Sequence, residues 1–347
     1  WLKYMHNPVL DLGLRDFRAP KVFWHAATSR WVMLVVLPDD RCVVFYTSRD
    51  LKQWHEASRF AAPFAGQGIW ECPDLMCLPV PGEDDAWLLK VDALAGHPSG
   101  GSGARLFFGR FDGERFTAEP EDAPVWADHG ADFYAALSWA GLHDRAVWIA
   151  WMNCHRYAKH LPTQPWRGAM TLPRELSLLR GANGRLRLLQ QPVREWSALR
   201  RRPVDLGALA LAAGEHRELP PIKDGVLEIE LDGIGAGDWW LDVRAGAAER
   251  TRIGYDAAAG ALFVDRSRSG FVPPGDAAYA ARRDAPCEAP RRVRVLADAS
   301  SVEVFADDGH TVITEQVFPS DDSRGVLIGA ASALHLAALR VWTLEPL

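Results

Sequence analysis

The sequence predicts an all-β protein in two parts, a domain of the β-propeller type followed by a β-sandwich. Short apolar runs separated by turn residues fill the 347-residue chain, which contains 29 glycines and 23 prolines. In the first part these runs form three sets of four, which begin near Phe17, Trp70 and Asp132. Four-stranded units that recur at intervals of about fifty residues are typical of propeller blades.

Each set opens with a strand that combines charged and aromatic residues, and this shared opening favours blades over three unrelated β-meanders. The runs are, in chain order, KVFWH, RWVMLVVL, CVVFYTS and KQWHEAS; ECPDLMCLPV, DAWLLKVDA, ARLFFGRFDG and RFTAEP; DFYAALSWA, RAVWIAWMN, MTLPRELSLL and GRLRLLQQP. Propellers close with about four to eight blades, and three blades alone would leave sheet edges open. We therefore expect further blades before Trp1.

The second part of the chain differs from the first in its pattern of apolar and polar residues. Residues 1–190 are expected to form the N-terminally incomplete propeller domain, and residues 191–206 a basic, partly helical connector. Between residues 207 and 347, runs such as GVLEIELDG, DWWLDVRAG and SSVEVFADDG alternate apolar and polar side chains with turns at short intervals. This pattern predicts an antiparallel β-sandwich.

Composition excludes several classes of function. A net charge of −6 weighs against a nucleic-acid partner, and the chain has no apolar run long enough to span a membrane. The five cysteines are expected to be free thiols, and the histidines, including those of HRYAKH at residues 155–160, show no metal-type spacing. HRYAKH is interpreted as a solvated loop. We expect neither metal nor cofactor; cytoplasmic and secreted locations, and the oligomeric state, stay open.

One carboxylate is a candidate general acid. In WECPDL, Glu71 lies between the apolar Trp70 and Cys72, which would desolvate the carboxyl and keep its proton available. By itself this position also fits an ordinary glutamate at the start of a strand. One set earlier, in FRAPKVFWH, Arg18 could orient a carboxylate or hold a sugar hydroxyl, whereas Ala19 carries no chemistry.

Taken together, these stretches resemble glycoside hydrolase family 32, the β-fructofuranosidases, which include invertases, levanases and inulinases. FRAPKVFWH resembles the family's Arg-Asp-Pro motif and WECPDL its Glu-Cys motif, while DHGADFYAALSW, WRGAMTLPRELSL, LFVDRSRSG and DASSVEVFADDG resemble later family signatures. The resemblance implies a five-bladed propeller, about three blades of which are in this chain, followed by a β-sandwich. It also implies fructose release from sucrose or β-fructans by a retaining mechanism.

The resemblance assigns roles to single residues. Glu71 takes the place of the family's acid/base, and Ala19 that of the aspartate that stabilises the transition state. Substrate contacts fall on Arg18, Asp132, Tyr134 and Trp151; core packing is the alternative for the last three. The family's nucleophile belongs to an Asn-Asp-Pro-Asn-Gly motif, which these 347 residues lack, so we expect it before Trp1.

These two departures from the family pattern leave three hypotheses. The chain is a fructose-releasing hydrolase impaired by Ala19 and the missing nucleophile segment, a non-catalytic fructan-binding remnant of the same fold, or a fructosyltransferase. Losing one transition-state contact commonly costs about 10²–10³ in rate, so the chain is expected to be nearly inactive. Ala19 itself is natural, engineered or a sequencing fault, and the coincidence of two departures favours a natural origin.

Overall fold

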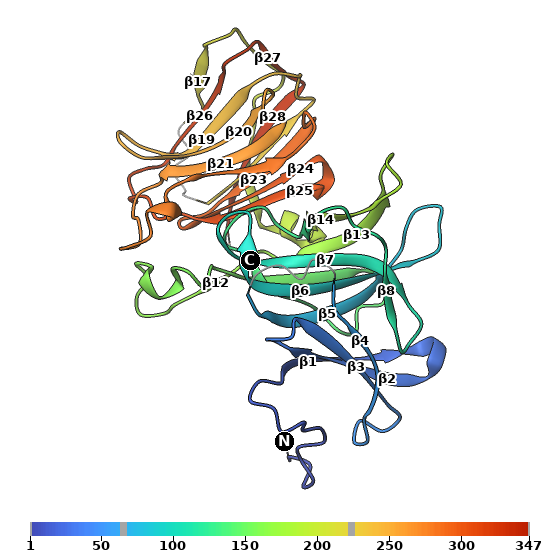
Figure 1. Cartoon of the computed structure of the whole chain (residues 1–347). Helices are drawn as coiled ribbons and strands as arrows, with labels where there is room; N and C mark the ends of the chain where they lie inside the picture. The colour runs from blue at the N-terminus through green and yellow to red at the C-terminus, as the bar shows by residue number, and fades with distance from the viewer. Residues whose placement is uncertain (1, 63–67, 221–225, 346–347) are drawn as a thin grey trace.

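The chain is all-β in the computed structural model, which describes residues 2–62, 68–220 and 226–345. Three sheets occupy the N-terminal half and two facing sheets the C-terminal half (Figure 1). Within the described ranges none of the helices is long and apolar enough to cross a membrane. All of them are short 3-10 segments, namely η1 (Ala26–Thr28), η2 (Ala158–His160), η3 (Arg194–Leu199), η4 (Ala277–Tyr279) and η5 (Asp307–Gly309).

The three N-terminal sheets confirm the predicted four-stranded units. The first sheet has the order β1 (Arg18–His25), β2 (Arg30–Leu37), β3 (Cys42–Ser48) and β4 (His55–Phe60). The second has β5 (Trp70–Leu78), β6 (Ala86–His97), β7 (Gly101–Phe111) and β8 (Phe116–Ala118), with β9 (Val125–Trp126) paired to β7. The third has β10 (Tyr134–Ser138), β11 (Ala146–Met152), β13 (Arg174–Arg180) and β14 (Leu186–Pro192), with β12 (Ala169–Met170) paired to β11.

Apolar side chains hold these sheets face to face. Val32, Phe45 and Trp70 belong to a buried cluster shared by the first and second sheets. Leu88 and Trp148 belong to a second cluster, shared by the second and third sheets. β-branched and aromatic residues suit such strands because their side chains fill the space between two pleated surfaces. The packing places β5 against both β1 and β10, so the first strands of the three sheets lie side by side.

A bulge interrupts each of these three first strands. The residue at each bulge has a left-handed backbone: φ is +57° at Ala19, +45° at Cys72 and +53° at Ala135. The register of each strand with its neighbour shifts at the same place. Bulges bend a strand and redirect the side chains beside them, and are frequent next to active sites. The first strands therefore share one local distortion at equivalent positions.

The C-terminal half is a sandwich of two six-stranded sheets, as predicted, around a core that includes Ile229, Val295, Leu241 and Ile253. One sheet has the order β15 (Arg200–Asp205), β28 (Ala338–Leu344), β18 (Leu227–Asp232), β23 (Arg292–Ala297), β24 (Ser301–Ala306) and β25 (Thr311–Gln316). The other has β17 (His216–Glu218), β26 (Gly325–Ala330), β19 (Trp239–Ala245), β20 (Arg250–Asp256), β21 (Ala261–Arg268) and β22 (Arg282–Pro286). β16 (Leu209–Leu211) pairs with β27 (Leu334–Leu336).

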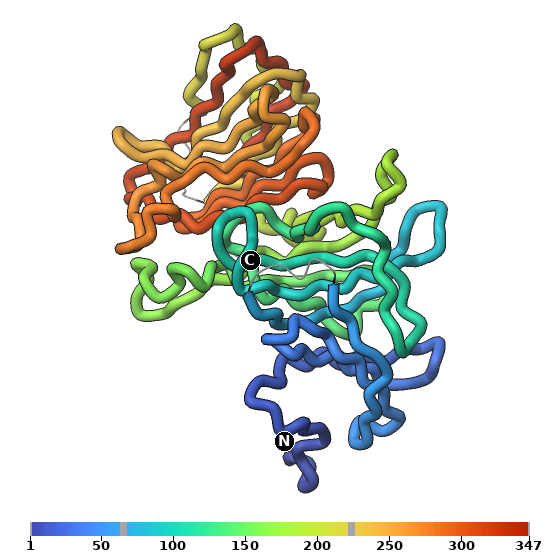
Figure 2. The backbone as a smooth tube through the Cα atoms, viewed as in Figure 1, coloured from blue at the N-terminus to red at the C-terminus, as the bar shows by residue number. Residues whose placement is uncertain are grey.

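The two halves meet along a tight face (Figure 2). Arg174 of β13 is fully buried and donates to Asp128 at 2.9 Å and to Glu303 of β24 at 2.8 Å. At Gly309 (φ +77°), an added Cβ would lie 1.6 Å from the carbonyl oxygen of Gln190, so only glycine fits there. Residues 191–206, expected as a connector, contain the end of β14, η3 and the whole of β15, which pairs with β28 of the sandwich.

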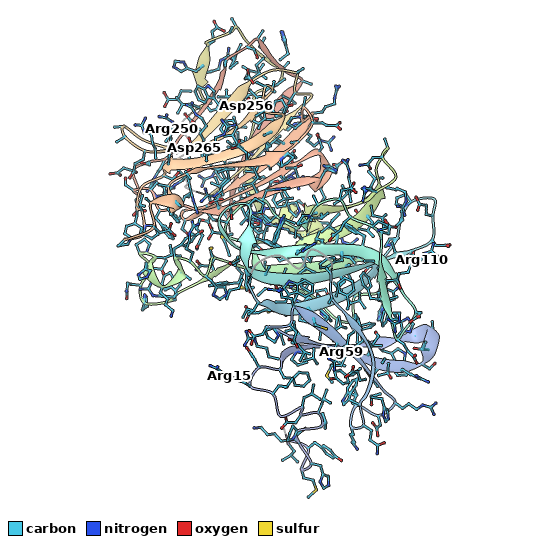
Figure 3. All side chains as sticks on the ribbon, viewed as in Figure 1. Arg15, Arg59, Arg110, Arg250, Asp256 and Asp265 are labelled. Carbon is cyan, nitrogen blue, oxygen red and sulfur yellow. The ribbon has the colours of Figure 1, made fainter. Side chains whose placement is uncertain are left out.

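Some charged side chains away from this face lie toward the surface (Figure 3). Arg15, in the segment before β1, points away from the ribbon, and Arg250, Asp256 and Asp265 lie on strands β20 and β21 of the sandwich (Figure 3).

Candidate functional site

Glu71 is the centre of a polar cluster contributed by all three N-terminal sheets. Arg18 Nη2 on β1 donates to Glu71 Oε1 at 2.9 Å, and Tyr134 Oη on β10 donates to Glu71 Oε2 at 2.5 Å. Each of the three residues directly precedes the bulge of its strand. Since the first strands lie side by side, residues separated by 53 and 63 positions in the sequence meet at one carboxyl group.

The cluster is open to solvent on one side. The Glu71 side chain is 20% exposed and that of Arg18 is 38% exposed, and Arg18 also forms an ion pair with Asp16. Burial, together with the charge of Asp92, raises the pKa of Tyr134 far above its usual range, so its hydroxyl stays a proton donor in this bond. A carboxyl group held on both oxygens and still accessible is suited to proton transfer with a bound ligand.

A second layer of polar contacts lies three or four residues further along the same strands. Lys21 Nζ is 3.2 Å from Asp74 Oδ1 and donates to the Ser138 carbonyl at 2.7 Å. The Ser138 amide donates to Asp74 Oδ2 at 2.6 Å. Asp74, the other acidic residue of WECPDL, is completely buried in these contacts. It therefore ties the three first strands together beneath Glu71.

An ion pair is buried behind Glu71. Lys90 Nζ donates to Asp92 Oδ2 at 2.6 Å and to the carbonyl of Cys72 at 2.7 Å, and neither charged side chain has any exposed surface. Asp92 on β6 is the cross-strand partner of Glu71. Burial raises the pKa of Asp92 to about 6, against the opposing effect of Lys90 and of the nearby Ala135 amide.

Aromatic rings flank the cluster. Trp151 on β11 is the cross-strand partner of Tyr134, with ring centroids 6.3 Å apart. The exposed His155 contacts both, with centroids 4.8 Å from Tyr134 and 5.1 Å from Trp151. The interpretation of residues 155–160 as a solvated loop missed this contact, and it missed Tyr157, which is fully buried. An aromatic residue at position 157, unusual for a solvated loop, was the available signal.

Ala19 lies beside this cluster, at the bulge after Arg18. Its methyl group packs, partly buried, against the cluster between the first two sheets. Left-handed φ costs an alanine about 1–2 kcal/mol, whereas aspartate and asparagine adopt this conformation more readily. The left-handed backbone at position 19 is therefore more favourable for aspartate, the residue that the family resemblance implies there, than for alanine.

Asp132 is placed elsewhere, and its expected substrate contact is corrected on that ground. Its side chain is completely buried at the junction with the sandwich, where Oδ2 accepts from Arg266 at 2.8 Å and Oδ1 from the hydroxyl of Tyr157 at 2.7 Å. The amide of Gln316 also donates to Oδ2 at 2.8 Å. Because every contact is to protein and none of its surface is exposed, Asp132 joins the two halves of the molecule.

The structure thus brings together Glu71, Arg18, Tyr134 and Trp151, with Ala19 at the edge, and separates Asp132 from them. Over the described ranges, no group of three or more histidine, cysteine, aspartate or glutamate side chains is arranged to hold a metal ion.

Both halves of the chain match models of known protein families. The model for the Glycosyl hydrolases family 32 N-terminal domain matches residues 1–192, and the model for the Glycosyl hydrolases family 32 C terminal matches residues 195–343. The chain belongs to glycosyl hydrolase family 32. The family resemblance inferred from the motifs is confirmed.

Two curated relatives of this family 32 chain are a levanase and an exo-inulinase. A levanase of Bacillus subtilis (strain 168) is 38% identical over 347 residues, which cover 96% of this chain and 51% of the levanase. An extracellular exo-inulinase of Aspergillus awamori is 34% identical over 350 residues, which cover 93% of this chain and 65% of the inulinase. The chain therefore spans between about half and two thirds of the length of these relatives.

Solved structures agree on the architecture. The crystal structure of the A. awamori exo-inulinase superimposes with a TM-score of 0.85 at 30% identity, over 98% of this chain and 70% of the inulinase. A β-fructofuranosidase of Schwanniomyces occidentalis gives a TM-score of 0.88 at 23% identity, over 99% of this chain and 73% of that enzyme. The second likeness shows the shared propeller and sandwich fold.

Proposed function

We propose that this family 32 protein is a glycoside hydrolase that releases fructose from sucrose or β-fructans, with Glu71 as its acid/base. The observation that carries the proposal is the Glu71 carboxyl, held by Arg18 and Tyr134 and open on one side. The names of the relatives, levanase and exo-inulinase, support the substrate class.

Glu71 would act twice in a retaining reaction. It first donates its proton to the glycosidic oxygen as the bond to fructose breaks, and then removes a proton from the water that releases fructose. Arg18 and Tyr134 fix both oxygens of the carboxyl, so the proton is delivered from one position. Trp151 and His155 offer aromatic faces beside it, on which a sugar ring can stack.

The retaining reaction also needs a nucleophilic carboxylate about 5–5.5 Å from the acid/base. Asp74 and Asp92 lie near Glu71 but are completely buried and bonded to lysines, so neither can reach a substrate. Besides Glu71, Asp16 is a carboxylate of this cluster with access to solvent; it is 30% exposed and paired with Arg18. Asp16→Asn therefore belongs in the test of the mechanism.

Fructose release from sucrose, inulin and levan tests the proposal. We expect Ala19→Asp to raise the rate by about 10²–10³, the usual effect of one transition-state contact. Ala19→Asn is the matched control, because it suits the same backbone and has the same size without the charge. Glu71→Gln in the Ala19→Asp protein should abolish the gain. If fructose release is absent from both the unchanged protein and Ala19→Asp when each carries the Asn-Asp-Pro-Asn-Gly segment expected before Trp1, the hydrolase proposal fails.

The alanine at position 19 favours a second candidate function, fructan binding without turnover. A propeller–sandwich protein that lacks the stabilising aspartate can still hold the sugar through Arg18 and the rings around Tyr134. Retardation in gels containing levan or inulin, weakened by Arg18→Met, would support binding. Binding without fructose release from Ala19→Asp would favour this function over the hydrolase.

A further inference from the structure

The buried pair Lys90–Asp92 touches each of the structural features that place Glu71. Lys90 Nζ donates to the carbonyl of Cys72, the bulge residue that directly follows Glu71. The Ala135 amide, at the bulge residue that directly follows Tyr134, lowers the pKa of Asp92 and so lies near its carboxylate. The pair therefore holds the bulge after Glu71 and lies close to the bulge after Tyr134, whose side chain donates to Glu71 at 2.5 Å.

Both bulges need such support. Cys72 and Ala135 have φ values of +45° and +53°, a conformation that is unfavourable for residues other than glycine and persists only where the surroundings impose it. At Cys72 the ammonium group of Lys90, itself paired with Asp92, forms a strong hydrogen bond to the backbone carbonyl. A buried ion pair commonly adds no stability over apolar side chains of similar volume, so its value lies in fixing a geometry.

The charge of Asp92 also affects the pKa of side chains that line the site. Asp92 is the cross-strand partner of Glu71, and after burial it is the largest influence that raises the pKa of both Cys72 and Tyr134. Burial and Asp92 together bring the pKa of Cys72 to about 11. Glu71 acts on Cys72 in the same direction, and the cations Lys90 and Arg18 oppose it.

We propose that Asp92, held by Lys90, is a positioning residue for Glu71: it holds the ammonium group that fixes the bulge directly after the acid/base, and it places a negative charge behind that strand. The proposal deepens the proposed function and rests on it for its catalytic meaning, but the arrangement itself can be measured without turnover.

Cys72 provides the measurement, because its thiol is partly exposed and next to Glu71. In Asp92→Asn, we expect Cys72 to react with iodoacetamide about threefold or more faster at pH 8, since tenfold more thiolate forms for each unit by which a thiol pKa falls. Peptide mass spectrometry can follow each cysteine separately. Cys77, whose pKa is also about 11 through burial and Asp85, is the internal control and should keep its rate.

Asp85→Asn is the matched control variant, because Asp85 raises the pKa of Cys77 as Asp92 raises that of Cys72. It should speed the labelling of Cys77 and leave Cys72 unchanged, because Asp85 acts on Cys77 and Asp92 on Cys72. The pH profile of Cys72 labelling in Asp92→Asn should shift to lower pH. A purely structural role for Asp92 would not produce that shift at one cysteine alone.

Loss of folding would show itself as faster labelling of the buried Cys42 and Cys154. For that case the variant Lys90→Met/Asp92→Asn removes both charges and keeps side chains of similar size at both positions. It should still label Cys72 faster than the unchanged protein, by a smaller factor, because Asp92 outweighs Lys90 at Cys72. A Cys72 rate that stays equal to that of the unchanged protein in the folded variant overturns the proposal. Failure to release fructose while Cys72 responds would instead count against the proposed function.

Discussion

The molecule contains two carboxylates with the same kinds of partner and opposite surroundings. Glu71 accepts from Arg18 at 2.9 Å and from the hydroxyl of Tyr134 at 2.5 Å, while Asp132 accepts from Arg266 at 2.8 Å and from the hydroxyl of Tyr157 at 2.7 Å. The Glu71 side chain is 20% exposed, whereas that of Asp132 has no exposed surface.

The difference shows how to distinguish an accessible candidate site from the joint, by which we mean the buried polar contacts of Asp132 at the interface between propeller and sandwich. Around Asp132 the sandwich supplies the arginine and a further backbone amide, from Gln316, so all contacts are internal. Around Glu71 the two partners come from neighbouring propeller strands, and one side remains open. A carboxylate, an arginine and a tyrosine therefore hold two domains together in one place and leave an accessible carboxylate in the other.

The largest effect is expected at the joint. Arg266→Met would leave Asp132 and Glu315 buried without their cation, and removing one partner of a buried ion pair costs about 3–5 kcal/mol. Urea unfolding followed by tryptophan fluorescence would measure the loss. Arg18→Met, at the open cluster, should lower the free energy of unfolding far less, and an equal loss for the two variants would remove the distinction between site and joint.

The two tyrosines give a matched pair. Tyr157→Phe leaves a buried oxygen of Asp132 without a donor, which costs about 1–3 kcal/mol in the free energy of unfolding. Tyr134→Phe should cost less stability, because water can reach Glu71. In the Ala19→Asp protein, however, it should slow fructose release by about 10–100-fold, the usual value of a hydrogen bond to a charged group. Unfolding curves and initial rates of the two variants check this, and the reverse pattern would contradict it.

The joint is also expected to respond to pH. Burial raises the pKa of Glu315 to about 7, with Arg266 opposing and Asp132 adding to the effect, because two carboxylates share one guanidinium. The folded protein therefore binds more protons than the unfolded chain between about pH 4.5 and 7, and this contribution to stability falls as pH rises through that window.

Glu315→Gln removes this contribution. The stability of the unchanged protein relative to Glu315→Gln should decrease from pH 5 to pH 8. Urea unfolding at both pH values measures it, and a difference that grows with pH would contradict the assignment.

The smallest effect is expected at exposed pairs. Arg194 and Asp144 form an ion pair at 2.8 Å with side chains 64% and 65% exposed. Solvent and salt screen such a pair, so Arg194→Gln should leave the urea midpoint unchanged within error. A clear shift at this pair would mean that contact geometry outweighs burial, and the comparison of Glu71 with Asp132 would then lose its basis.

The sequence by itself determined the all-β class, the three four-stranded units, the sandwich and the family. Alternating and apolar strand runs are local patterns that depend little on what packs against them, and WECPDL places Glu71 on the first strand of its sheet. Family motifs likewise placed Arg18, Tyr134 and Trp151 near it. The role of each in catalysis stays a prediction.

Only the tertiary structure decided what surrounds these residues. Asp132 and Tyr134 stand two positions apart in one motif, yet Asp132 meets Arg266, 134 residues further along the chain, while Tyr134 meets Glu71. His155 contacts Tyr134 and Trp151 although its own stretch reads as solvated. The physical reason is that burial and the sharing of charge depend on which sheets pack together, and no local pattern carries that information.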